Sequence, residues 1–264
     1  KRGMERRSKD MILTDYSLDE KSFRKGHNYI SVLSSPKLGV ILDVEQGRDK
    51  AATKKLLEKV IPPEGRESVE TISIDMWKAY LTTAQEVLPN AKIVHDRYHL
   101  STYLNKAIDQ VRRREVKDNE ELKNSRFTLL KNKDNLTEKQ QIKFQHIQDA
   151  NYEVSRAWRV REDFKGIFNS STTKDALELF LKWSSSVLHT KIKEVIKVGK
   201  IFNNHLSGVI NAMTHTQSNG MAERLNGKIQ EIKTIGRGYR TFENFRSAIL
   251  FFHGGLSLYP HNSW

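Results

Sequence analysis

Residues 217–228 read Gln-Ser-Asn-Gly-Met-Ala-Glu-Arg-Leu-Asn-Gly-Lys. The polar Asn219-Gly220 pair predicts a turn that opens a helix. Apolar side chains then recur at helical spacing, at Met221, Leu225, Ile229 and Ile232. This spacing predicts a stripe that packs on a core. Glu223 falls in the first helical turn and off that stripe, which suits either a surface glutamate or a carboxylate that binds a metal ion near a phosphate.

The composition indicates a polyanionic partner. The 264 residues include 45 Lys and Arg against 32 Asp and Glu, a formal net charge of +13 at pH 7. Such a balance is typical of proteins that bind nucleic acid. The chain has no cysteine, which excludes disulfides and Cys-ligated zinc within this sequence. It also has no apolar run of membrane-spanning length and no apolar segment typical of a signal peptide, so we expect no membrane partner.

Strand and helix patterns alternate over the first hundred residues. Tyr16 to Leu18 is a short apolar run that leads to Asp19. Further strands are predicted at residues 29–33, 40–44, 69–74 and 91–94, and helices at 49–60 and 77–88. The resulting order of three strands, helix, strand, helix and strand predicts an α/β fold with a mixed five-stranded sheet flanked by helices.

Only helix patterns follow between residues 100 and 205. We therefore expect three segments along the chain. These are a first part of an α/β core at 1–100, an all-helical insertion at 101–205, and a C-terminal part of the core, with the Glu223 helix, at 206–264.

Three carboxylates are candidates for a metal site. Asp19 and Asp75 stand at the ends of predicted strands, and Glu223 follows on a helix. Strand ends at one sheet edge share a crevice, and a helix packed across that edge adds a third carboxylate. Oxygen ligands without cysteine favour Mg²⁺ or Mn²⁺. Two such ions can activate a nucleophile and stabilise the leaving oxygen in phosphodiester cleavage.

Other interpretations of these carboxylates stay open at this point. An aspartate at a strand end is often a turn former. Asp15, Glu20 and Asp43 are alternative first ligands, although Asp43 lies within a predicted strand, a less natural ligand position.

Four blocks of sequence resemble one family, the ISL-three group of bacterial insertion-sequence transposases. They are residues 19–29 (DEKSFRKGHNY), 73–80 (SIDMWKAY), 88–99 (LPNAKIVHDRYH) and 218–226 (SNGMAERLN). The blocks occur in order over nearly the whole chain, which makes the resemblance far more specific than any single motif.

The resemblance implies an RNase H-like catalytic core with a DDE triad, interrupted by a large all-α insertion before the helix of the catalytic glutamate. By position, Asp19, Asp75 and Glu223 would be the catalytic and metal-binding residues, with two Mg²⁺ or Mn²⁺ ions. Members of the family usually carry an N-terminal zinc-binding segment and a helix-turn-helix. Neither is present here, and we expect this chain to begin after them.

The implied activity is metal-dependent DNA cleavage and strand transfer at the ends of an insertion sequence. The implied partners are double-stranded DNA, both transposon ends and target, and further copies of the chain on that DNA. The implied location is the bacterial cytoplasm, in association with the nucleoid.

Further side chains are candidates for DNA contacts or for support of the site. Asp96 and His99 are auxiliary candidates near the carboxylates; a local ion pair, a turn or a helix cap explains them as well. Residues expected to contact DNA are Arg24, Lys25, His27, Arg112, Arg113, Arg114, Arg224, Asn226, Arg237 and Arg240, together with the basic stretch 191–200. Each alone is also explained by a solvated surface.

Three rival functions remain from sequence. One is a catalytically inactive DNA-binding remnant of a transposase. Another is an RNase H-like nuclease that acts on RNA–DNA hybrids. The last is a basic helical interaction module, which predicts binding that weakens steeply with salt and no ion among the carboxylates.

Overall fold

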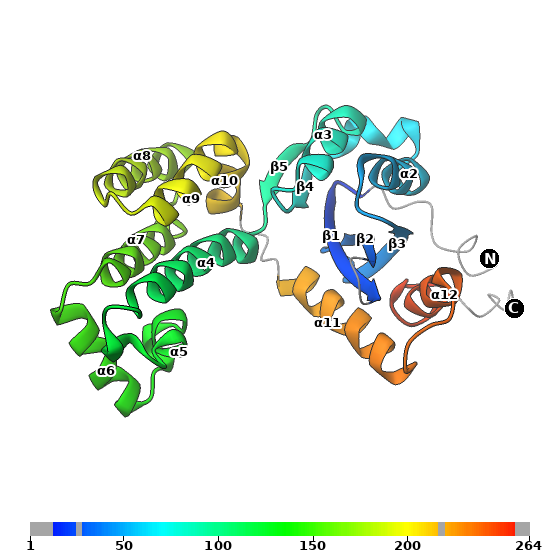
Figure 1. Ribbon diagram of the computed structural model, residues 1–264. Coiled ribbons are helices and arrows are strands. Elements are labelled where there is room, and N and C mark those ends of the chain that lie inside the picture. The colour runs from blue at the N-terminus through cyan, green and yellow to red at the C-terminus, as the bar shows by residue number, and fades with distance from the viewer. Residues whose placement is uncertain (1–12, 25–27, 216–219, 257–264) are drawn as a thin grey trace, which may run out of the picture. The chain divides into compact units, whose positions relative to one another are not determined.

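The computed structural model describes residues 13–24, 28–215 and 220–256, without the side chains of residues 222 and 223. The chain forms two compact units (Figure 1). One is built from residues 1–96 together with 216–264, and the other from residues 97–215.

The first unit contains a mixed five-stranded sheet. Its strands are β1 (Asp15–Arg24), β2 (Asn28–Ser35), β3 (Val40–Gln46), β4 (Thr71–Ile74) and β5 (Lys92–His95). The spatial order is β3-β2-β1-β4-β5. Strands β1, β2 and β3 pair antiparallel, whereas β4 pairs parallel to β1 and β5 pairs parallel to β4. The predicted mixed sheet is therefore confirmed.

Strand β1 is longer than the sequence pattern predicts. The pattern ends the strand before Asp19, but the structure continues it to Arg24. The extension exists because the polar residues after Leu18 pair with β2, with Asp19 opposite Val32 and Lys21 opposite Ile30. Asp19 consequently lies within a strand and not at its end.

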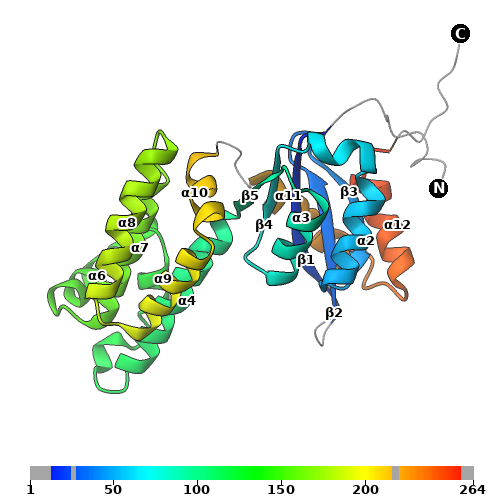
Figure 2. The same ribbon diagram turned by 90° about the horizontal axis from the view of Figure 1, so that it is seen from above.

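Two pairs of helices cover opposite faces of this sheet, as Figure 1 and Figure 2 show. Helices α2 (Lys50–Val60) and α3 (Lys78–Val87), joined by the short 3-10 helix η1 (Pro63–Ser68) and strand β4, pack on one face. Helices α11 (Gly220–Ile235) and α12 (Phe242–His253) pack on the other. The predicted stripe of α11 is confirmed: Leu225, Ile229 and Ile232 are buried against β1, β2 and β3, and Met221 packs beside them.

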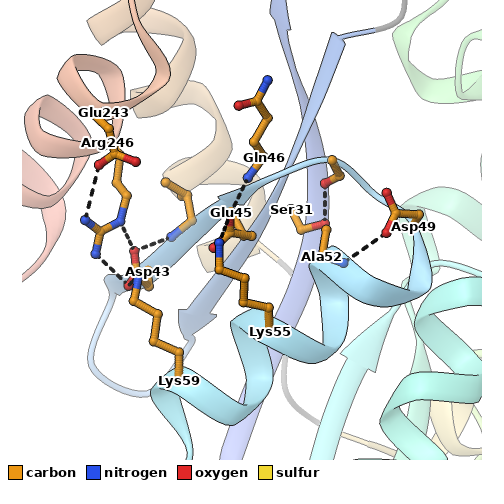
Figure 3. Close-up of polar contacts among 12 residues, drawn as sticks. Ser31, Asp43, Glu45, Gln46, Asp49, Ala52, Lys55, Lys59, Glu243 and Arg246 are labelled. Atoms are coloured by element: carbon orange, nitrogen blue, oxygen red, sulfur yellow. Dashed lines mark hydrogen bonds and ion pairs between the residues drawn. The ribbon is translucent and has the colours of Figure 1, made fainter.

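The edge strand β3 is held to both helix layers by a buried ion cluster (Figure 3). Asp43 is 1% exposed and accepts two hydrogen bonds from Arg246 of α12, at 2.7 and 2.8 Å. Lys59 of α2 lies 2.9 Å from the same carboxylate. Burial by itself raises the pKa of Asp43, but the hydrogen bonds from Arg246 and Lys59 outweigh it, so the pKa lies below its ordinary value.

The second unit is all helical in its described residues. Its main helices are α4 (Arg97–Glu115), α5 (Arg126–Leu130), α6 (Glu138–Asp149), α7 (Glu153–Ile167), α8 (Thr173–His189), α9 (Lys193–Asn204) and α10 (Leu206–Thr214), with short 3-10 turns η2 (Glu120–Leu122) and η3 (Lys133–Asn135). Aromatic rings form its centre: Phe164 lies 4.9 Å from Trp183 and 5.0 Å from Phe202, centroid to centroid. Among the described residues of both units, no helix is long and apolar enough to cross a membrane.

One arginine joins the beginning and the end of the second unit. Arg97, the first residue of α4, donates from Nε to the carbonyl oxygen of Ala212 at 2.6 Å and from Nη2 to that of His215 at 2.9 Å. Its guanidinium also lies 4.9 Å from the ring centroid of Phe168. These bonds satisfy carbonyl groups that α10 leaves open at its C-terminus.

Candidate active site

The sheet register places Asp19 and Asp75 on neighbouring strands at the same level. Leu18 of β1 pairs with Ile74 of β4 in parallel register. The residue that follows each member of this pair is an aspartate. Asp19 lies within β1, and Asp75 comes directly after the end of β4. Neighbouring strands lie about 4.8 Å apart, so the two backbones that carry these carboxylates are adjacent.

Asp96 extends this row to a third strand. Ile74 also pairs with His95, the last residue of β5. The amide of Asp96 then donates to the carbonyl oxygen of Ile74 at 3.1 Å, which carries the register one residue further. Asp96 is buried. It therefore follows β5 beside Asp75, as an auxiliary carboxylate would.

Asp19 is connected to helix α11 through Asn226. Oδ1 of Asp19 accepts from the amide of Glu20 at 2.7 Å, and Oδ2 accepts from the side-chain amide of Asn226. Asn226 is only 9% exposed. The sequence suggested Asn226 as a DNA contact, and the structure places its side chain against Asp19, the first candidate carboxylate.

Glu223 lies on the same helix, three residues before Asn226. Its backbone is within α11, a little less than one turn or about 4.5 Å along the axis from Asn226, and on an adjoining side of the helix. Its side chain lies outside the described residues. The contact between Asn226 and Asp19 fixes the level at which the Glu223 backbone passes the sheet.

Asp75 is oriented by the backbone that follows it. Its Oδ1 accepts from the amide of Met76 at 2.6 Å. Met76 is buried, and the next residue, Trp77, precedes helix α3 with 42% of its surface exposed. The carboxylate thus belongs to a short segment between the end of β4 and the start of α3.

The alternative first ligands all have other strong partners. Asp15 accepts from Thr14 Oγ1 at 2.8 Å and from Thr71 Oγ1 at 2.5 Å. Glu20 receives Arg48 Nη1 at 2.8 and 3.0 Å. Asp43 is part of the ion cluster with Arg246 and Lys59. Each of these contacts holds the sheet or its connections together.

The donor chemistry of Asp19 and Asp75 fits a hard divalent cation. Both side chains are carboxylates, and the oxygens of a carboxylate together offer about four acceptor positions. An oxygen that is oriented by a hydrogen bond can therefore still bind an ion. Among the described side chains, no group of three His, Cys, Asp or Glu residues is arranged to hold a metal ion. The side chain of Glu223, the predicted third ligand, is outside that set.

The residues proposed to contact DNA or support the site differ in their exposure and in their partners within the protein. Arg24 ends β1 and donates from Nη2 to the carbonyl oxygens of Tyr239 and Arg240, which fixes the loop between α11 and α12. Arg224, Arg237 and Arg240 are exposed on the first unit. Lys25 and His27 lie outside the described residues. His99 is half-buried in the first turn of α4.

The arginine run of α4 is engaged in ion pairs within the helical unit. Arg112 and Arg113 lie 2.7 and 2.8 Å from the Asp109 carboxylate. Arg114 reaches Glu153 at 2.5 Å and Glu194 at 3.0 Å. The positive charge of this run is therefore largely offset by neighbouring carboxylates.

Helix α9 presents a different kind of basic surface. Lys193, Lys197 and Lys200 are exposed at positions i, i+4 and i+7, on the side opposite the buried Val195 and Phe202. Within the described part of the chain, none of the three lysines forms an ion pair. We call these three residues the α9 lysine stripe.

The first unit has a mixed sheet with aspartates at the same level of two adjacent strands, β1 and β4. Helix α11, which contains Glu223, packs on the sheet and contacts β1. This arrangement is that of an RNase H-like α/β core. Here the core is interrupted by a helical unit. The chain belongs to the ISL-three family of DDE transposases: the model of that family, described as "Transposase", matches residues 17–249.

Two groups of relatives support this assignment. The transposase for insertion sequence element IS1001 of Bordetella parapertussis is 26% identical over 237 residues, which cover 87% of this chain and 58% of that protein. The transposase for insertion sequence element IS1557 of Mycobacterium tuberculosis is 25% identical over 256 residues, covering 85% of this chain and 56% of the relative. The chain thus spans less than two thirds of the length of these relatives.

Proposed function

We propose that this chain is the catalytic part of an insertion-sequence transposase that cuts DNA at element ends and joins the freed 3′-hydroxyl to target DNA. The observation that carries the proposal is the shared level of Asp19 on β1 and Asp75 directly after β4, with α11 attached to Asp19 through Asn226. Membership of the transposase family supports polynucleotidyl transfer as the chemistry of this arrangement.

In this proposal Asp19, Asp75 and Glu223 hold one or two Mg²⁺ or Mn²⁺ ions. When bound, these ions supply activation of the attacking hydroxyl and charge stabilisation at the leaving oxygen. The described residues orient the ligands. Asn226 fixes one oxygen of Asp19, and the amide of Met76 fixes one oxygen of Asp75. Such preorientation lowers the barrier by positioning and by charge stabilisation.

Water and DNA hydroxyls are the nucleophiles in this proposal, so no covalent protein–DNA intermediate is required. Asp96 serves as an auxiliary carboxylate beside Asp75, and its buried position supports that role. His99 stays a predicted auxiliary residue.

The proposed partner is double-stranded DNA. The α9 lysine stripe, and the exposed Arg224, Arg237 and Arg240 of the first unit, supply cationic surface for its phosphates. Association of several copies on DNA, in the cytoplasm beside the nucleoid, completes the proposal.

The decisive experiment compares Asp75→Asn with the unchanged chain in Mn²⁺-dependent nicking of supercoiled plasmid and in joining of a labelled oligonucleotide 3′-end to that plasmid. We expect Asp75→Asn to abolish both. Asp134→Asn, at an exposed position of the helical unit, is the control and keeps full activity. Nicking that survives Asp75→Asn would refute the assignment.

Two further outcomes distinguish the rival functions. Hydrolysis of the RNA strand of an RNA–DNA hybrid, without any joined product, would favour an RNase H-like nuclease. Salt-sensitive DNA binding without metal-dependent cleavage would favour an inactive DNA-binding remnant.

A further inference from the structure

Arg48 lies in a rigid connection between β3 and α2. The preceding Gly47 has a φ of +99°, donates to the carbonyl oxygen of Tyr29 at 2.9 Å, and accepts from Ser31 Oγ at 2.8 Å. The following Asp49 caps α2 by accepting from the amide of Ala52 at 2.9 Å. The backbone of Arg48 is therefore fixed on both sides.

The Arg48 side chain is attached to β1 and β2. Its Nη1 lies 2.8 and 3.0 Å from the two Glu20 oxygens, and its guanidinium lies 4.0 Å from the ring centroid of Tyr29. The side chains of Arg48 and Glu20 are only 32% and 26% exposed. Glu20 is the direct neighbour of Asp19 on the strand.

Arg48 is attached at the same time to the segment that carries Asp75. Its guanidinium lies 4.7 Å from the ring centroid of Trp77, and the Trp77 indole Nε1 donates to the Arg48 carbonyl oxygen at 2.9 Å. This segment follows the last residue of β4, so the sheet ladder no longer fixes it. Beyond the sheet, the segment is held by the burial of Met76 and by the contacts between Trp77 and Arg48.

We propose that Arg48 is a positioning residue that sets the separation of Asp19 and Asp75. It reaches the first aspartate through Glu20 and the second through Trp77. The same contacts give Glu20 a role that its position beside Asp19 did not reveal. The consequence for catalysis rests on the proposed function, whereas the consequence for geometry does not.

A planar guanidinium is required for this role. Its Nη1 donates to Glu20 while its central carbon lies over the Tyr29 and Trp77 rings. A lysine ammonium keeps the charge but has no plane to match two rings and a carboxylate together. Arg48→Lys therefore separates positioning from simple charge.

The first test measures geometry without metal or DNA. Because the chain has no cysteine, Ser22→Cys and Lys78→Cys introduce two unique spin-label sites, both exposed, on β1 and at the start of α3. In pulsed electron paramagnetic resonance we expect a narrow distance distribution that Arg48→Lys broadens. Glu86→Gln, which removes an exposed partner of Lys50 and Lys54, leaves it unchanged. An unaltered distribution in Arg48→Lys overturns the proposal.

The second test measures ligand binding and catalysis. We expect Arg48→Lys to weaken Mn²⁺ binding by about 10- to 100-fold, the range found when residues supporting metal ligands are changed. Its melting temperature and plasmid binding should match those of Glu86→Gln. Absence of nicking by the unchanged chain would refute the proposed function, while the distance measurement would still decide the role of Arg48. Unchanged Mn²⁺ affinity in Arg48→Lys, with Asp75→Asn losing it, would overturn the positioning role.

Discussion

The side-chain amide of Asn226 donates a hydrogen bond to Asp19 Oδ2 and thereby joins helix α11 to the central strand β1. Apolar burial of Leu225 and Ile229 holds the helix on the sheet but does not select its position along the strand. A directional bond to one carboxylate oxygen makes that selection, because its geometry tolerates little displacement. The helix that contains Glu223 is thus aligned by Asp19, the first aspartate of the candidate site.

Asn226→Ala should weaken this alignment. We expect a loss of about 1.5–3 kcal/mol in the free energy of unfolding, since a partly buried hydrogen bond to a charged group is removed. The rate of DNA nicking should fall by more than the decrease in the folded fraction of the protein. Urea unfolding and a nicking assay measure the two effects. Asn203→Ala, which removes the side-chain bonds of an exposed asparagine to Ser184 and to the Gly199 carbonyl, is the control. Full nicking activity in Asn226→Ala would contradict the alignment role.

The ion cluster of Asp43 predicts a stability loss in acid. The folded-state pKa of Asp43 lies below its unfolded value, so the ionised form favours folding. This contribution is fully present above the unfolded pKa, about 4, and is lost as the pH falls through the folded pKa. Urea unfolding between pH 7 and pH 2.5 should show this dependence in the unchanged chain and a weaker one in Asp43→Asn. Identical pH profiles for the two chains would show that Asp43 does not contribute.

Arg246→Ala should be more harmful than Asp43→Asn at pH 7. It leaves a carboxylate that is 1% exposed, and Lys59 is then its one cationic partner among the described residues. Breaking a buried pair in this way costs about 3–5 kcal/mol. Adding Asp43→Asn to Arg246→Ala should restore part of the loss, because the unpaired charge is then removed. Additive effects in urea unfolding would count against direct coupling of the two residues.

Substitutions in the α9 lysine stripe and in the arginine run of α4 should affect the salt dependence of DNA binding differently. Replacing Lys193, Lys197 and Lys200 with Gln should lower the slope of log affinity against log salt by about 0.9 for each phosphate that the protein no longer neutralises. Arg113→Gln should leave the slope unchanged, because Arg113 is paired with Asp109. Fluorescence anisotropy with a duplex at several salt concentrations measures both. A slope that is reduced in Arg113→Gln but not in the lysine variant would show that the arginine run, and not the α9 lysine stripe, contacts the DNA phosphates.

Local patterns were sufficient for much of the fold. The β-branched runs and the apolar spacing of α11 predicted the strands and the buried helix face, because each depends on neighbours close in sequence. The extent of β1 was not predictable in this way. Its polar second half is held by pairing with β2, which replaces the apolar alternation on which a strand pattern depends.

The partners of charged residues were the main information absent from the sequence pattern. Arg114 binds Glu153 and Glu194, 39 and 80 residues away, and a run of three arginines gives no sign of that. Arg48 likewise meets Glu20 and Trp77 only after the sheet and α3 have formed. Asp19 and Asp75 were chosen as candidates because family blocks surround both, and the sheet register places their backbones side by side. Ion pairs between distant elements have no such local signature.

Arg97 provides a final prediction, on the helical unit. Its guanidinium binds the carbonyl oxygens of Ala212 and His215 and lies on the ring of Phe168. Arg97→Lys cannot bond to these carbonyls in the same fork geometry, so the end of α10 should open more often. Hydrogen exchange read by mass spectrometry should show faster exchange in peptides covering residues 206–215 and little change in α8. Arg126→Lys, an exposed change in the same unit, is the control. Unchanged exchange in α10 would show that Arg97 does not secure this end of the unit.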